Sequence, residues 1–250
     1  MIDDLLSLRA LVVSPEEGLR GLFRQASSYS TVPIEIIETA DADSACAASA
    51  DGADLAYLDG ALPPVQITRV TSALRTTAKP AFTIHLAVSA AVQSFETDGL
   101  AGKPSRPEQA NWLLERSMRV RLPSRVLVVD DSATMRSIVR KTLAATRFPL
   151  EVSEVGEGFA ALKLVRESDF HIVFLDYNMP DFNGLETLAE FKREKRRVSV
   201  VMMTSTPHEE LADRARAAGA AFLKKPFFPA DIETVLCGFY GLRALNPKRG

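Results

Sequence analysis

The stretch VLVVDD, Val126–Asp131, decides the predicted fold because it joins an apolar strand to two adjacent carboxylates. A run of β-branched residues of this kind is typical of a buried parallel strand. Such a strand would carry Asp130 and Asp131 at its carboxyl end. Open α/β sheets bind their ligands at the carboxyl ends of their strands, so this pair predicts a functional site.

Two later stretches end in the same way. FHIVFLDYNMP (170–180) has Asp176 at the end of an apolar run, and AAFLKKPF (220–227) ends its run in Lys225. Because the carboxyl ends of parallel strands meet at one edge of a sheet, we expect these two side chains to join the acidic pair in one crevice.

Three carboxylates in one crevice repel one another. At about 4 Å and an effective dielectric near 20, each like-charged pair costs roughly 4 kcal/mol. An all-oxygen cluster without His or Cys favours a hard cation such as Mg²⁺ as the compensating charge. The alternative is that each aspartate caps a helix or turn, although Ser132 and Thr134 offer that function without the acids. The coincidence with Asp176 and Lys225 at matching strand ends favours the metal site.

Asp176 is the predicted reactive group, because it stands alone at its strand end before a turn. A carboxylate beside a divalent cation can attack an activated phosphoryl group and form an acyl phosphate. Lys225 can place its ammonium on a phosphoryl oxygen, and Thr204, at the end of another apolar run, offers a hydroxyl. The alternative for Lys225 is a plain salt bridge to Asp176.

Strands and helices alternate along the whole chain, which predicts an α/β fold with a parallel sheet covered by helices on both faces in each half. In the first half, strands are expected at 8–13, 32–38, 55–59, 80–87 and 100–103, and helices at 15–29, 41–50, up to 77, 89–95 and 106–121. In the second half, strands are expected at 125–130, 150–155, 171–176, 198–204 and 221–225, and helices at 132–147, 158–168, 184–195, 208–218 and 231–242.

The two halves are an internal repeat. LRALVVSP matches RVLVVDDS, DLAYLDGALPP matches HIVFLDYNMPD, and LAGKPSRP matches FLKKPFFP, at offsets of about 116, 117 and 122 residues. The repeat predicts a first domain at 1–122 and a second domain at 123–250.

The second half resembles the receiver domain of bacterial two-component response regulators, and the single-domain chemotaxis regulator is an especially near relative. The resemblance covers about 124–240 and rests on four stretches: VLVVDDSATMRSIVRKTL (126–143), FLDYNMPDFNGLETL (174–188), VVMMTS (200–205) and FLKKPF (222–227). It implies a flavodoxin-like (βα)5 fold, a doubly wound parallel sheet with strand order 2-1-3-4-5.

The resemblance also implies roles for single residues. Asp176 would be the phosphoacceptor, and the phosphoryl donor would be a phosphohistidine of a histidine kinase or a histidine phosphotransfer protein. The residues implied to share the site are the Mg²⁺ ligands Asp130, Asp131, Asp176 and the backbone carbonyl of Asn178, and the phosphoryl contacts Thr204 and Lys225.

Phe222 falls where the family carries a switch aromatic, often Tyr. A Phe has no hydroxyl, so a signal from it would rest on packing, and a plain core aromatic is the alternative. The implied switching face comprises helix four, strand five and helix five, at about 208–218, 221–225 and 231–242. A homodimer through this face is one arrangement that the resemblance suggests.

The first half is a degenerate copy. Asp59 and Lys103 persist at the matching strand ends, but Ser14 and Pro15 stand where the acidic pair should lie. Without that pair a divalent cation keeps too few charged ligands. Asp59 and Lys103 are then expected to neutralise each other, so the first domain is predicted to be a pseudo-receiver.

Two further features of the first half bear on this interpretation. Glu16 and Glu17 are expected on the helix that follows, and the fourth strand, AFTIHL, has no clear counterpart of the Thr204 hydroxyl. His85 lies in that strand, where a single histidine is more often a buried, hydrogen-bonded core residue than a ligand.

Composition excludes several classes of protein. The net charge is −2, with 46% hydrophobic and 25% charged residues, so no global field recruits nucleic acid or a membrane. The two cysteines, Cys46 and Cys237, suit a reduced setting better than a disulfide framework. No signal-peptide layout and no apolar run near the roughly 20 residues of a membrane span are present. We therefore expect a cytoplasmic protein.

These features together predict a tandem-receiver response regulator that signals by protein–protein contact with a downstream target, without a DNA-binding or enzymatic output domain. Two rival functions remain. A phosphatase that forms an aspartyl phosphate usually has a second acid two residues after its nucleophile, where this chain has Asn178. A scaffold or dimerisation module that never takes phosphate is the other rival.

Overall fold

The structure is a computed structural model that describes residues 7–87, 96–180, 183–193, 198–205 and 209–244. The helix expected at 89–95 lies outside the described residues. The chain divides into two compact units: the first comprises 1–121 together with 237–250, and the second comprises 122–236. The domain limits predicted from the sequence, 1–122 and 123–250, assign the last residues differently and stay a prediction.

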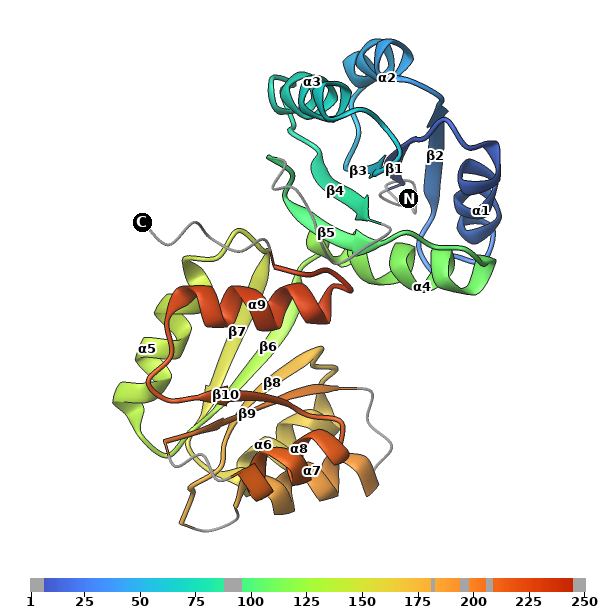
Figure 1. Ribbon diagram of the computed structural model, residues 1–250. Coiled ribbons are helices and arrows are strands. Elements are labelled where there is room, and N and C mark those ends of the chain that lie inside the picture. The colour runs from blue at the N-terminus through green and yellow to red at the C-terminus, as the bar shows by residue number, and fades with distance from the viewer. Residues whose placement is uncertain (1–6, 88–95, 181–182, 194–197, 206–208, 245–250) are drawn as a thin grey trace, which may run out of the picture. The chain divides into compact units, whose positions relative to one another are not determined.

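The first unit is a five-stranded parallel sheet with the order β2-β1-β3-β4-β5. Helix α1 packs beside α4, and α2 packs beside α3 on the other face of the sheet (Figure 1). The strands are β1 (Leu8–Val13), β2 (Ile34–Thr39), β3 (Leu55–Asp59), β4 (Phe82–Ala87) and β5 (Gly99–Gly102). The helices are α1 (Glu17–Ser27), α2 (Ala42–Ala48), α3 (Pro64–Arg75) and α4 (Pro107–Ser117), with short 3-10 helices at Ser49–Asp51 and Met118–Val120.

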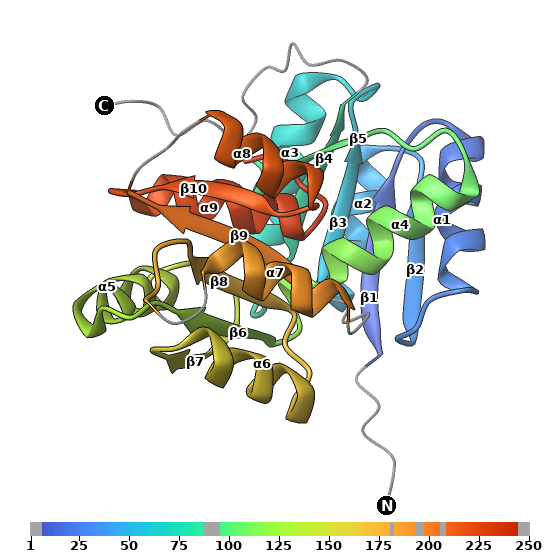
Figure 2. The ribbon, with the colours of Figure 1, turned by 90° about the horizontal axis from the view of Figure 1, so that it is seen from below.

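The second unit repeats this architecture with the order β10-β9-β8-β6-β7, which can be followed from strand to strand in Figure 2. Both sheets therefore have the order 2-1-3-4-5, which confirms the expected flavodoxin-like fold. The strands are β6 (Ser124–Val129), β7 (Leu150–Val155), β8 (Ile172–Asp176), β9 (Ser199–Thr204) and β10 (Ala221–Lys224). The helices are α5 (Ala133–Ala144), α6 (Gly158–Glu167), α7 (Gly184–Arg193), α8 (Glu209–Ala217) and α9 (Pro229–Phe239).

The central strands are buried on both faces, as their apolar sequences require. Val126–Val129 in β6 are fully buried, and every residue of β8 is buried. Burial on both faces leaves these strands only their ends for contact with solvent, so polar side chains concentrate at the carboxyl edge.

Helix α9 ends earlier than the sequence predicted. The expected helix ran from 231 to 242, whereas α9 begins at Pro229, a residue well suited to the first turn, and ends at Phe239. Gly241 has φ 73°, in the left-handed region that terminates helices. Among the helices of the described residues, none is long and apolar enough to cross a membrane.

Candidate functional site

The ends of β6 and β8 bring the predicted carboxylates together. These strands are hydrogen-bonded neighbours in the second sheet, so their carboxyl ends lie at the same edge. Asp130, Asp131 and Asp176 each offer one carboxylate oxygen, and these three atoms lie within 4.8 Å of one another. Asp130 and Asp176 are buried, and Asp131 is exposed. The acids expected to meet do form one cluster.

Lys225 supplies positive charge to this cluster. Its Nζ donates to Asp130 Oδ2 at 2.6 Å and to Asp176 Oδ1 at 2.9 Å. Its backbone N–H donates to the carbonyl of Thr204 at 2.7 Å, which fixes the lysine beside the end of β9. The side chain is only 9% exposed, so water screens the two ion pairs weakly. The lysine therefore offsets part of the repulsion among the acids.

Burial controls the protonation of these groups. Removal from water raises the pKa of Asp176 above its usual value, and the hydrogen bond from Lys225 offsets only part of that rise. For Lys225, burial lowers the pKa, but the hydrogen bonds to Asp130 and Asp176 outweigh burial and the pKa is raised. The raised pKa keeps Lys225 charged, whereas its positive charge does not fully compensate the burial of the Asp176 carboxylate.

The loop after β6 is held by hydrogen bonds between its backbone and nearby side chains. The Ser132 N–H donates to Asp130 Oδ1 at 2.9 Å, and the Ser132 hydroxyl caps α5 by accepting from the Met135 N–H at 3.3 Å. Arg136 Nη1 donates to the carbonyls of Asp130 at 2.7 Å and Asp131 at 3.3 Å. The sequence interpretation had assigned no function to Arg136.

Gly184 allows helix α7 to begin directly against the strand end that carries Asp176. A Cβ at this position would lie 2.6 Å from the Asp176 carbonyl oxygen and 2.7 Å from Met202 Sδ. Asn183 caps the helix, because its Oδ1 accepts from the N–H groups of Leu185 and Glu186, each at 3.0 Å. Only glycine fits here, and this requirement was also missed from the sequence.

Three other residues were predicted to belong to the site. Thr204 ends β9 and is fully buried at the strand end next to that of Asp176. Asn178 is exposed, two residues beyond Asp176. Phe222 is partly buried and packs against the apolar core of the second unit. Their predicted roles stay predictions.

The cluster fits Mg²⁺ by its donor set. All three side chains are carboxylates, two of them are buried, and Lys225 bonds two of them, Asp130 and Asp176. Oxygen-only ligands with excess negative charge are the usual environment of a hard divalent cation. Asp130, Asp131 and Asp176 are the residues that could hold it.

The first unit has the same backbone arrangement with different side chains. The Ser14 N–H donates to the Thr39 carbonyl at 3.0 Å, as the Asp130 N–H donates to that of Val155 at 3.2 Å. The Lys103 N–H donates to the carbonyl of Ala87 at 3.1 Å, as that of Lys225 donates to Thr204. These bonds make Ser14 the counterpart of Asp130, and Ala87 that of Thr204.

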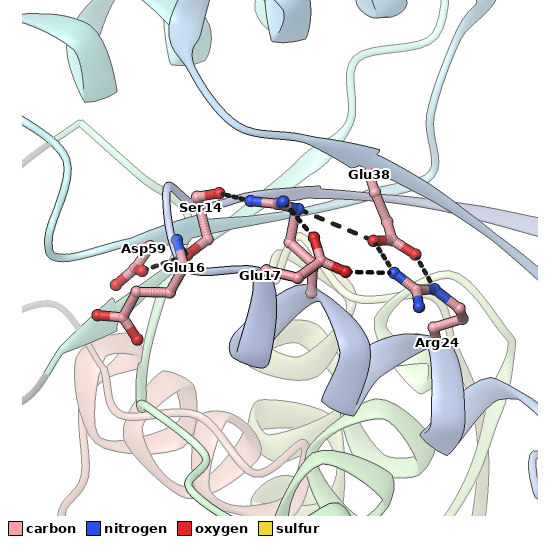
Figure 3. A network of polar contacts seen from close by, with 7 residues as sticks. Ser14, Glu16, Glu17, Arg24, Glu38 and Asp59 are labelled. Atoms are coloured by element: carbon pink, nitrogen blue, oxygen red, sulfur yellow. Dashed lines mark hydrogen bonds and ion pairs between the residues drawn. The ribbon is translucent and has the colours of Figure 1, made fainter.

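Asp59 is neutralised within this degenerate site. It is fully buried, accepts from the Ser14 hydroxyl at 2.5 Å and pairs with Lys103 Nζ at 3.0 Å. Lys103 also donates to Glu16 at 2.7 Å, which the sequence interpretation did not foresee. Figure 3 shows Ser14 pointing at Asp59 with Glu16 beside them. The expected pairing of Asp59 with Lys103 is present, and Ala87 provides no hydroxyl.

His85 is expected to make the first unit sensitive to mild acid. Burial lowers its pKa, and Asp59 opposes that shift only in part. The unfolded chain therefore takes up a proton near the usual pKa of about 6.5 that the folded chain resists, so the free energy of unfolding should fall as pH drops from about 6.5 to 5. Urea unfolding followed by the fluorescence of Trp112, the only tryptophan, measures this. A His85→Gln variant should lose part of this pH dependence; an unchanged pH dependence would contradict the assignment.

The fold and site together define a class of protein: a two-domain α/β protein in which the second domain carries an acidic cluster bridged by a lysine. The comparison with known families connects this class to two-component signalling. Residues 126–236 match the response regulator receiver domain. The chain belongs to this family.

Individual relatives match about half of the chain. Chemotaxis protein CheY-3 of Vibrio cholerae serotype O1 is 31% identical over 115 residues, which cover 45% of this chain and 88% of that protein. Transcriptional regulatory protein PdtaR of Mycobacterium tuberculosis is 33% identical over 130 residues, which cover 50% of this chain and 62% of that protein.

Solved structures match both halves at once. A protein described as a two-component system response regulator/GGDEF domain protein superposes with a TM-score of 0.52 at 19% identity, covering 93% of this chain and 97% of that chain. A second structure of this description gives a TM-score of 0.51 at 20% identity. At these identities the likeness shows the fold alone, and it supports two receiver folds in tandem.

Proposed function

We propose that the protein is a response regulator of a two-component phosphorelay in which Asp176 accepts a phosphoryl group from a histidine kinase or a histidine phosphotransfer protein. The observation that carries this proposal is the geometry at the carboxyl edge of the second sheet. Three carboxylates lie within 4.8 Å of one another, and Lys225 bonds to two of them.

The reaction assigned to Asp176 is a transfer between two nucleophiles. One carboxylate oxygen forms the new bond to phosphorus while the bond from phosphorus to the donor imidazole nitrogen breaks, and that nitrogen keeps the electron pair. Lys225 neutralises charge on the phosphoryl oxygens, with the Thr204 hydroxyl as a second contact. Bound Mg²⁺ would supply charge neutralisation for both the carboxylate and the incoming group. Asp130, Asp131, Asp176 and the Asn178 carbonyl would hold it.

The first domain is proposed to be a pseudo-receiver that takes no phosphate. Its buried acid, Asp59, already has Lys103 and Ser14 as partners, and Ser14 and Pro15 stand where the second domain has its acidic pair. The nearby carboxylate of Glu16 is bonded to Lys103. Without that acidic pair, the first domain does not reproduce the set of carboxylate ligands found in the second domain.

Output is proposed to occur by protein–protein contact with a downstream target in the cytoplasm. Phosphorylation would bias the face made by α8, β10 and α9, where Phe222 packs against the core, and this face is also the candidate homodimer surface. Nucleic acid and membrane are not proposed as partners. The protein would catalyse at most its own phosphorylation and dephosphorylation.

Incubation with acetyl phosphate and Mg²⁺ tests the proposed function. Intact-protein mass spectrometry should detect the addition of one phosphoryl group to the parent and to Asp59→Asn, and none to Asp176→Asn. Beryllofluoride should compete with this uptake. Turnover of generic phosphate esters would instead support a phosphatase, and absence of any phosphoryl uptake would support a scaffold.

A further inference from the structure

The arginine that follows the acidic pair is the feature from which a further inference can be drawn. Arg136 lies on α5, and its side chain is 21% exposed. Its Nη1 donates to the backbone carbonyls of Asp130 and Asp131, at 2.7 Å and 3.3 Å. These hydrogen bonds go to the main chain and not to the carboxylates of the cluster. The guanidinium thus holds the main chain of the acidic loop and leaves the acid side chains free to face the cluster.

A second arginine and a glutamate hold Arg136 from the other side. Glu154, on the neighbouring strand β7, pairs with Arg136 Nε at 3.7 Å and with Arg140 Nε at 2.7 Å. Gly156 leaves room for the guanidinium, because a Cβ there would lie 3.2 Å from Arg136 Nη1. Arg140 shares the glutamate with Arg136, and its ion pair in the described part of the chain is with Glu154 and not with the acidic loop.

The first unit contains the same arrangement of two arginines and one glutamate. Arg20 Nη1 donates to the Ser14 carbonyl at 2.5 Å, and Glu38 pairs with Arg20 at 3.8 Å and with Arg24 at 2.6 Å. Figure 3 shows Arg24, Glu38 and Glu17 joined in one network above α1. In each unit this arginine therefore donates to the carbonyl of the residue that follows the first strand. In the first unit that residue is Ser14, whose hydroxyl donates to Asp59, and in the second unit it is Asp130, whose carboxylate accepts from Lys225.

We propose that Arg136 is a positioning residue for the metal site, because it fixes the main chain of Asp130 and Asp131 so that both carboxylates face one cation. This inference rests on the proposed Mg²⁺ site. Residues that orient metal ligands from outside the coordination shell typically change metal affinity by about 10- to 100-fold when they are removed.

The sign of the effect separates positioning from simple charge. A guanidinium near a cation repels it, so loss of the charge alone would tighten Mg²⁺ binding. Loss of a positioning contact loosens the loop and weakens Mg²⁺ binding. The two explanations therefore predict opposite changes in the dissociation constant.

The test is calorimetric titration of Mg²⁺ into the full chain and its variants. Arg136→Met should bind Mg²⁺ about tenfold more weakly than the parent. Arg140→Met, which removes a neighbouring arginine with the same glutamate partner, should bind as the parent does. Affinity of Arg136→Met equal to or tighter than that of the parent overturns the proposal. If Arg136→Met does not fold, Arg136→Lys replaces it, because lysine keeps the positive charge but lacks the planar guanidinium that reaches both carbonyls. A Mg²⁺ affinity of Arg136→Lys equal to that of the parent also overturns the proposal.

Hydrogen exchange in metal-free protein provides a readout that does not depend on Mg²⁺. The N–H groups of Asp131 and Ser132 should exchange several-fold faster in Arg136→Met than in the parent, while Arg140→Met leaves them unchanged. If the parent binds no Mg²⁺, the proposed function fails and the positioning role fails with it. Faster exchange would then show only that Arg136 orders the loop. Unchanged exchange in Arg136→Met overturns the positioning role even where Mg²⁺ binds.

Discussion

Replacing Lys225 by methionine is expected to destabilise the metal-free second unit by about 3 kcal/mol, which corresponds to a fall in its melting temperature of roughly 10 °C. The lysine is the partner of two buried acids, Asp130 and Asp176, whose side chains are 1% and 7% exposed. Without it they remain buried beside each other with no positive charge between them, which is among the most unfavourable single changes a folded protein can undergo.

Magnesium is expected to reverse most of this loss. The variant keeps all three carboxylates and loses the ammonium that competes with a cation, so Mg²⁺ should stabilise Lys225→Met more than it stabilises the parent. A ligand at a hundred times its dissociation constant stabilises the folded state by about 2.7 kcal/mol. Differential scanning calorimetry with and without Mg²⁺ measures both effects.

Lys224 provides the matched control. It precedes Lys225 in the sequence, but its side chain is exposed. Lys224→Met should change the stability by less than about 0.5 kcal/mol, with the Mg²⁺ response of the parent. Metal-free Lys225→Met that is as stable as the parent, or that gains no more from Mg²⁺, would contradict the interpretation of the cluster.

The corresponding change in the first unit, Lys103→Met, should also destabilise the protein, by about 2 kcal/mol, but Mg²⁺ should not reverse it. Asp59 is fully buried and would keep the hydroxyl of Ser14 and the N–H of Ala61 as hydrogen-bond donors, but no positive charge from Lys103. The effect is smaller than in the second unit because one buried acid is left instead of two. Ser14 supplies no charge to a cation, so the added ion has no comparable cluster to bind.

Urea unfolding followed by the fluorescence of Trp112 reports on the first unit. The control is Arg69→Met, since both side chains of the Arg69–Asp43 ion pair are exposed and such a pair contributes little. Recovery of Lys103→Met by Mg²⁺ would mean that the first unit retains a metal site after all, and the pseudo-receiver assignment would fail.

The proximity of the charged residues in the second unit could be predicted from the sequence because these residues lie at strand ends. A strand delivers its last residue to the edge of the sheet whatever the side-chain rotamers, so Asp130, Asp176 and Lys225 could be brought together from topology alone. The same reasoning aligned Asp59 with Lys103. The internal repeat strengthened it, since two copies of one pattern at nearly constant offset are hard to explain by any other fold.

Contacts made by long side chains could not be predicted in this way. Glu16 precedes α1 rather than lying on it, and its carboxylate reaches Lys103 from there. Arg136 reaches back along its own helix to the acidic loop, a direction set by rotamers that the sequence does not specify. One signal was available: in both copies an arginine lies six residues and another lies ten residues after the first residue that follows the strand, Ser14 or Asp130. These arginines are Arg20 and Arg24 in the first copy and Arg136 and Arg140 in the second. Comparison of the copies for shared charges, as well as for shared strand ends, would have found them.

Gly184 connects the site to the body of the domain. With only a hydrogen in place of a side chain, the first residue of α7 lies against the main-chain oxygen of Asp176, and a hydrogen bond of 3.1 Å from the Gly184 N–H to the Tyr177 carbonyl holds the two segments together. Because no flexible side chain lies between them, a displacement of the main chain at Asp176 would also displace the start of α7.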